Sequence, residues 1–277
     1  MAESRFERPA PERTIPQQRV IQKLDGYMAQ RDYAGAERHL KYWLEEACAL
    51  ADARGELMVR NELIGHFRKT GDKSQALAHA DAALRLLDEL GMAETITAGT
   101  TYTNAATACN AFGENERALE LFRKAAAVYE ASPYTEARLL GGLYNNMGLA
   151  CVALRRFDEA DGLFAKALST MGNVEGGELE QAITYLNMAD ALRARTEAQA
   201  ASYDVADADA DDAAAACEKT ISSYLDTALD LLDAPTVARD GYYAFVCEKC
   251  APVFGYYGYF LADRDLRERA EAIYERA

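Results

Sequence analysis

The sequence lacks a long apolar run and has few cysteines. Its longest apolar run covers residues 251–262, about a dozen residues, whereas a membrane-spanning helix needs about 20. The first 16 residues contain three prolines among alternating arginines and glutamates, and so lack the apolar core of a signal peptide. Six cysteines among 277 residues are too few for a disulfide scaffold. We therefore expect a cytoplasmic protein with reduced thiols.

Signatures of common enzymes are also missing. The sequence contains no GxxxxGK(S/T) phosphate loop, no HExxH zinc motif and no GxSxG nucleophile motif, and no GxGxxG follows a predicted strand. Glu62 and His66 share one helical face, but a pair of this kind arises readily by chance. We expect a protein that is not an enzyme.

Two local patterns resemble metal sites but are incomplete. Cys247-Glu-Lys-Cys250 has the spacing of half a zinc site, yet zinc takes about four ligands, and no second cysteine or histidine pair has suitable spacing. An acidic stretch from Asp207 imitates a calcium loop that ends at Glu218, but Asp212 stands where the turn needs glycine. We interpret the stretch as an acidic loop, and we expect no metal and no cofactor.

Basic residues are scarce relative to acidic ones. The chain has 30 lysines and arginines against 45 aspartates and glutamates, for a formal net charge of −15. Residues 1–41 hold eight basic and six acidic side chains, so the remainder carries about −17. A nucleic acid would be repelled by most of this surface. The charge therefore argues against nucleic acid and would speed encounter with a basic partner, and the missing apolar run argues against a membrane. The groove residues described below favour a protein or peptide partner that is neutral or basic.

The sequence does contain an internal repeat, with a period of about 42 residues. Segments 102–106, 144–148 and 185–189 read YTNAA, YNNMG and YLNMA, and each begins about one period after the last. Apolar residues recur at three- and four-residue steps, which is typical of amphipathic helices. No alternating β pattern of useful length occurs. The sequence thus predicts an all-α protein.

Each repeat is expected to form two helices joined by a short polar turn. In residues 70–72, a glycine after one helix and an aspartate before the next are typical stop and start signals. The expected helix pairs span residues 18–54, 56–90, 95–131, 135–171, 179–233 and 236–276. The expected domains are a flexible tail (1–16), the repeats (17–234) with an acidic insertion (197–212), and a divergent, aromatic-rich C-terminal cap (235–277).

The small and aromatic residues of the repeat resemble those of the tetratricopeptide repeat family. The matching residues are Gly148, Phe157, Ala160, Phe164 and Ala167. The unit is longer than the family's common unit of about 34 residues, and is similar to the repeats of kinesin light chains and bacterial peptide-pheromone receptors. The resemblance implies a right-handed superhelical solenoid of antiparallel helix pairs, with a concave groove that binds a protein or peptide segment.

Asparagines recur on the face that this resemblance places in the groove. Asn104, Asn146 and Asn187 share one repeat position, and an asparagine side chain offers both a donor and an acceptor to a peptide backbone. The alternative is that these amides bond neighbouring helices. Six further groove residues are expected: Asn61, Thr107, Asn110, Asn145, Asp190 and Arg193.

The groove face carries little positive charge. Receptors of this family that clamp a terminal carboxylate use lysine or arginine there, whereas the first-turn positions here are Thr100, Gly142 and Ile183. Glu62 and Asp190 add negative charge. This pattern argues against a carboxylate-tail ligand.

Two sets of aromatic residues have different expected roles. Tyr102, Tyr144 and Tyr185 share one repeat position, and the resemblance implies that this position packs the first helix on the second. Eight aromatics crowd residues 242–260, where Pro252 should kink or break the helix. Gly255 and Gly258 should let another helix approach closely. This region is either a packed cap or a secondary interface, for which the candidate residues are Tyr243, Phe254, Tyr257 and Tyr259.

These observations favour a non-enzymatic, cytoplasmic adaptor that binds a protein or peptide in its groove. Two alternatives remain open. One is a peptide-signal sensor that resembles the pheromone receptors without their DNA-binding domain. The other is a homo-oligomer that assembles through the C-terminal aromatic helix.

Overall fold

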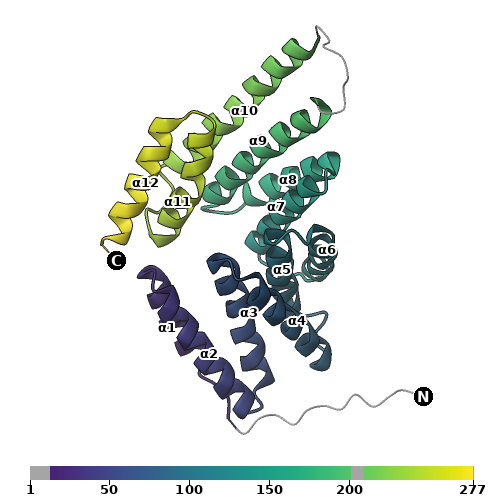
Figure 1. Ribbon diagram of the computed structural model, residues 1–277, viewed down its shortest axis with the longest axis vertical. Helices are drawn as coiled ribbons and strands as arrows, with labels where there is room; N and C mark the ends of the chain where they lie inside the picture. Colours follow the sequence, from purple (N-terminus) through teal and green to yellow (C-terminus); the bar gives the residue numbers. More distant parts are fainter. Residues whose placement is uncertain (1–12, 201–208, 277) are drawn as a thin grey trace, which may run out of the picture. The chain divides into compact units, whose positions relative to one another are not determined.

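The computed structural model describes residues 13–200 and 209–276 (Figure 1). Residues 1–12 of the expected tail and residues 201–208 of the expected insertion, including Asp207, lie outside the described residues. Within the described part, the secondary structure is α-helical without strands, which confirms the all-α prediction. The chain divides into two compact units, Met1–Pro133 and Tyr134–Ala277.

The first unit contains three antiparallel helix pairs. Each helix contacts the next one along the chain, and α3 also contacts α5. The helices are α1 (Gln17–Ala29), α2 (Tyr33–Ala49), α3 (Ala53–Thr70), α4 (Lys73–Glu89), α5 (Ile96–Ala111) and α6 (Asn115–Ala131).

The second unit also contains three pairs. The first helix of the middle pair, α9, contacts the first helices of the pairs on both sides, α7 and α11. The helices are α7 (Ala137–Ala153), α8 (Phe157–Met171), α9 (Glu178–Ala200), α10 (Asp209–Asp233), α11 (Gly241–Tyr256) and α12 (Phe260–Tyr274). All six expected pairs are therefore present, with ends within a few residues of those predicted.

The turns between paired helices follow the signals in the sequence. Gly71 ends α3 with a φ of 81°, a left-handed conformation that glycine adopts without strain. The next residue, Asp72, accepts a 3.0 Å hydrogen bond from the backbone N–H of Gln75 and so caps α4. In the fourth pair, Arg155 holds a φ of 57° without a glycine.

Paired helices approach closely where the repeat places a glycine. A Cβ atom added at Gly148 of α7 would lie 2.5 Å from the ring of Phe164 on α8. At Gly99 of α5 it would lie 2.3 Å from the ring of Tyr129 on α6. A small residue on the first helix thus receives an aromatic ring from the second. The small and aromatic residues of the repeat therefore lie where the two helices of a pair press together.

The repeated tyrosines also join the two helices of a pair. The ammonium of Lys124 lies 5.9 Å from the Tyr102 ring centroid, and Lys166 lies 5.3 Å from that of Tyr144. In the fifth pair, the ring of Tyr185 packs against Tyr224 of α10 at 5.9 Å. The predicted packing role of the three tyrosines is confirmed.

The C-terminal pair shares one core with α9 and α10. Phe254 and Tyr243 of α11 are fully buried among apolar residues of these helices, such as Leu186 and Leu225. Of the kink or break expected at Pro252, the break is wrong, because α11 continues through Pro252 to Tyr256. A proline inside a helix costs about 3 kcal/mol. Burial of the apolar face of α11 offsets this cost.

The two C-terminal glycines differ in role. A Cβ atom at Gly255 would lie 2.8 Å from the carboxylate of Asp263 on α12, so the predicted close approach of another helix is confirmed there. Gly258 has open space around it and a φ of 83°. For Gly258 the prediction is wrong, because this glycine serves the turn between α11 and α12.

Candidate peptide-binding face

In the first unit, two predicted groove asparagines bond to each other. Asn104 on α5 donates a 2.9 Å hydrogen bond from Nδ2 to Oδ1 of Asn61 on α3. Nδ2 of Asn61 donates to the backbone oxygen of Leu57 at 2.9 Å and to Oγ1 of Thr101 at 3.0 Å. Asn61 is therefore occupied within the unit, whereas Asn104 retains an oxygen and one N–H.

The other first-unit residues lie nearby on the same helices. The hydroxyl of Thr107 donates to the backbone oxygen of Thr103 at 2.7 Å. The Oδ1 atom of Asn110 is buried and has no hydrogen-bond partner among the described residues. Glu62 stands at the position equivalent to Asn104, one repeat earlier. Burial raises the pKa of Glu62, and the negative charge of Asp25 on α1 raises it further.

The second unit contains a matching pair of amides. Asn187 on α9 donates a 2.9 Å hydrogen bond to Oδ1 of Asn145 on α7, whose side chain is buried. Asn146, the next residue along α7, is half-buried. No side-chain bond of Asn146 is found within residues 13–200 and 209–276, so its donor and acceptor groups both remain available.

One turn further along α9, three predicted residues meet. The hydroxyl of Tyr257 donates to Oδ1 of Asp190 at 2.8 Å, and Nε of Arg193 donates to the same hydroxyl at 3.3 Å. Arg193 also pairs with Glu197 at 2.5 Å and lies 4.9 Å from the ring centroid of Tyr256. Burial raises the pKa of Asp190, against the lowering effects of Tyr257 and Arg193. The positive charge of Arg193 is thus already paired.

The four residues of the expected secondary interface do not form one exposed surface. Tyr243 and Phe254 are 1% and 0% exposed, because both fill the core beneath α11, and they are not available to a partner. Tyr257 belongs to the Asp190 cluster. The hydroxyl of Tyr259 donates to Asp226 on α10 at 3.0 Å. The large apolar side chains that α11 and α12 do expose are others: Tyr242, Phe245, Tyr256, Phe260 and Leu261.

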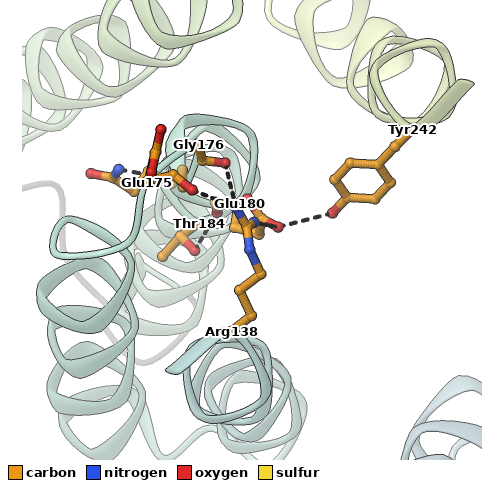
Figure 2. Close-up of polar contacts among 8 residues, drawn as sticks. Arg138, Glu175, Gly176, Glu180, Thr184 and Tyr242 are labelled. Atoms are coloured by element: carbon orange, nitrogen blue, oxygen red, sulfur yellow. Dashed lines mark hydrogen bonds and ion pairs between the residues drawn. The ribbon is translucent and has the colours of Figure 1, made fainter. Parts of the chain in front are cut away.

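A cleft of about 790 Å³ opens at the N-terminal ends of α7, α9 and α11. Figure 2 shows its polar centre, where Arg138 from α7 and Tyr242 from α11 converge on Glu180 of α9. Nη1 of Arg138 donates to Oε1 of Glu180 at 2.6 Å, and the Tyr242 hydroxyl donates to the same oxygen at 3.4 Å. Nη2 of Arg138 donates to the backbone oxygens of Glu175 and Gly176 at 2.7 and 3.0 Å.

Two carboxylates of the cleft keep an unused acceptor. Thr236 donates a 2.6 Å hydrogen bond to Oε1 of Glu178, which lowers the pKa of that carboxyl group. The second oxygens of Glu178 and Glu180 are buried and lack a hydrogen-bond partner among the described residues. A buried acceptor without a partner is costly, so these atoms favour a ligand that donates hydrogen bonds.

Sequence reasoning missed this cleft. Arg138, Glu180 and Tyr242 come from three helices, and they lie 42 and 62 residues apart along the chain. The available signal was that Glu180 stands seven residues before Asn187, and so two turns away on one side of α9. The sequence did not indicate that the loop before α11 would approach that turn.

The cysteine pair is placed in the core. Cys247 and Cys250 are buried free thiols on α11, and burial raises the pKa of Cys250 to about 12. Such a thiol is not poised to become a reactive thiolate or a metal ligand. Within the described ranges, no cluster of three or more histidine, cysteine, aspartate or glutamate residues suits a metal ion.

No described helix is both long and apolar enough to span a bilayer.

Comparison with known proteins gives similarities of fold. No protein-family profile and no curated protein sequence matches the chain. BtubC (BKLC) from P. vanneervenii is 17% identical, with 88% of this chain and 90% of that chain covered and a TM-score of 0.49. A putative kinesin light chain repeat structure from Podosopora anserina is 14% identical, with coverages of 80% and 95% and a TM-score of 0.47. The quorum sensor NprR from B. thuringiensis is 15% identical, with coverages of 91% and 74% and a TM-score of 0.40.

Proposed function

We propose that the chain is a non-enzymatic scaffold that binds a protein or peptide segment along the first helices of its pairs. The observation that carries the proposal lies in the second unit. The cleft at Glu180 and the half-buried amide of Asn146 belong to neighbouring first helices, α9 and α7, and both retain unused hydrogen-bonding groups. A cytoplasmic location belongs to this proposal and rests on the sequence.

The length of α9 sets the size of the ligand. Glu180, Asn187 and Asp190 follow one another at steps of seven and three residues, so they lie within about 80° of one another around the helix axis. With a rise of about 1.5 Å per residue, this row is about 15 Å long. An extended peptide advances about 3.3 Å per residue. A segment of about five residues therefore matches the row.

The charges favour a basic segment. Arg138 and Arg193 are each paired with a glutamate, at 2.6 and 2.5 Å, and so offer little to an incoming carboxylate. The unused oxygens of Glu178 and Glu180 instead accept from a lysine or arginine side chain in the cleft. Amides such as Asn146 then bond the peptide backbone.

A randomised hexapeptide library displayed on phage tests the proposal. We expect the chain to enrich sequences that contain lysine or arginine. The affinity of an enriched peptide, measured by fluorescence anisotropy, should fall at least tenfold in Asn146→Ala and in Glu180→Gln. Asn115→Ala on α6 and Glu271→Gln on α12 are controls that remove the same chemical groups elsewhere, and should stay within twofold.

Two outcomes would contradict the proposal. One is the absence of enrichment over an unrelated acidic protein. The other is equal affinity in all four variants, which would place binding away from the first helices of the second unit. Melting temperatures of the variants establish that any loss of binding does not come from unfolding.

A further inference from the structure

A second recess lies in the first unit, between α1 and α2. It encloses about 420 Å³. Pro16 and three residues in the first two turns of α1 form one wall, and two rings of α2 form the other. The lining residues are Pro16, Arg19, Gln22, Lys23, His39 and Trp43. None of the six is acidic, although the chain as a whole has a net charge of −15.

The two cations of this recess lie on the surface of α1. Arg19 and Lys23 are exposed and stand four residues apart, so they project from the same side of α1. Neither forms an ion pair with a carboxylate in the part of the chain that the structure describes. The ammonium of Lys23 lies 5.0 Å from the ring centroid of Tyr27, a contact that does not neutralise its charge.

The opposite wall is aromatic and held in place. Nε2 of His39 is 2.9 Å from the backbone oxygen of Val20 on α1, which fixes the imidazole between the helices. The half-buried Trp43 ring packs edge-on against His39 at 6.4 Å and against Tyr42 at 5.1 Å between centroids. A fixed indole beside two exposed cations offers apolar contact and positive charge together.

We propose that this recess binds an acidic segment of a partner protein, with carboxylates on Arg19 and Lys23 and an apolar side chain against Trp43. From Pro16 to Lys23 the wall is about 10 Å long. This length matches about three extended residues. A long polyanion such as a nucleic acid is disfavoured, because the acidic remainder of the chain repels it. The inference does not depend on the proposed function, since the recess lies in the other unit and selects the opposite charge.

Trp43 makes the site directly observable, because it is the only tryptophan in the chain. The probe is the acetylated and amidated peptide Glu-Leu-Glu-Leu-Glu, titrated into the full chain while tryptophan fluorescence is recorded. We expect a saturable change with this peptide and none with its lysine counterpart Lys-Leu-Lys-Leu-Lys. The affinity should fall as salt is raised, since the cations are exposed.

Two matched double variants test whether the peptide binds in this recess. Arg19→Glu with Lys23→Glu should weaken binding at least tenfold. Arg54→Glu with Arg85→Glu makes the same change of charge at exposed positions outside the recess, and should stay within twofold. The inference is overturned if both double variants weaken binding equally, or if no saturation is seen by about 1 mM peptide, a concentration that corresponds to about −4 kcal/mol.

Discussion

The side chain of Asn187 on α9 donates a 2.9 Å hydrogen bond to Asn145 on α7, across the contact between two first helices. In the first unit, Asn104 bonds Asn61 in the same way. Each bond uses one N–H of the donor, and within residues 13–200 and 209–276 the oxygen and second N–H of that donor make no other hydrogen bond. Asn104 and Asn187 therefore join neighbouring first helices, whereas Asn146, at the same repeat position, forms no such bond to any described helix.

Adjacent asparagines on α7 should respond differently to alanine. Asn145→Ala removes the buried acceptor of Asn187 and should lower the free energy of unfolding by about 1–2 kcal/mol. Asn146→Ala removes a half-buried side chain that bonds no described residue, and should change that free energy by less than about 0.5 kcal/mol. Urea denaturation followed by circular dichroism measures both. Equal losses would mean that Asn146 also has a packing role.

The hydroxyl of Tyr257 should control the ionisation of Asp190. Its hydrogen bond lowers the pKa of Asp190 against the larger raising effect of burial. Tyr257→Phe should therefore raise this pKa further, and should lower the free energy of unfolding by about 1.5 kcal/mol at neutral pH. Carbon-13 NMR titration of the labelled carboxyl group follows the pKa.

The neighbouring tyrosine supplies the control for Asp190. Tyr256 contacts Arg193 through its ring rather than its hydroxyl, so Tyr256→Phe should leave the titration of Asp190 unchanged. If the two phenylalanine variants shift the titration equally, the hydroxyl bond is not the cause.

His79 should make the first unit less stable in mild acid. Burial, together with the positive charges of Arg60 and Lys41, lowers its pKa from 6.5 to about 4. Between these values the unfolded chain takes up a proton that the folded chain does not. The free energy of unfolding should therefore fall as pH decreases from about 6.5 to about 4, by up to about 3 kcal/mol, and this contribution should level off below pH 4.

A phenylalanine variant isolates this effect. The His79 ring stacks on Phe67 with centroids 5.6 Å apart and an interplanar angle of 4°, a contact that His79→Phe retains. His66, whose pKa burial also lowers, is present in both proteins and cancels in the comparison. The difference in unfolding free energy between wild type and variant should change across pH 6.5 to 4. Parallel profiles would show that His79 does not titrate as described.

The helices were predictable because local signals define them. The apolar period gives each helix, and pairs such as Gly71 with Asp72 mark its end and the next start. The break expected at Pro252 failed because contacts between distant helices, and not local signals, decide whether α11 continues. The effect of this proline as a helix breaker is local, whereas the core contacts of Phe254 that keep α11 intact come from helices far away in the sequence.

The site was predictable only in part. Repeat register aligns Asn187 with Asn146, yet the bond goes to Asn145, one residue earlier, and Asn104 likewise bonds Asn61 rather than its register equivalent. The stagger between neighbouring first helices sets this offset, and the sequence does not encode it in any local pattern. For the same reason, the meeting of Asp190 with Tyr257 required the structure.

Two of the three glycines of α7, Gly142 and Gly148, should separate close packing from helix propensity. Gly148→Ala places a Cβ atom 2.5 Å from the Phe164 ring, so the ring or the helix must shift, and the free energy of unfolding should fall by about 1–3 kcal/mol. Gly142 has no atom within 4 Å of that position, so Gly142→Ala should raise the free energy of unfolding by about 0.5–1 kcal/mol. Thermal and urea denaturation of both variants measure these changes. Both glycines sit in one helix, so a lower free energy of unfolding for Gly148→Ala and a higher one for Gly142→Ala would trace the loss to the contact of Gly148 with Phe164. An increase in both variants would show that α7 and α8 pack less closely at Gly148 than the 2.5 Å distance indicates.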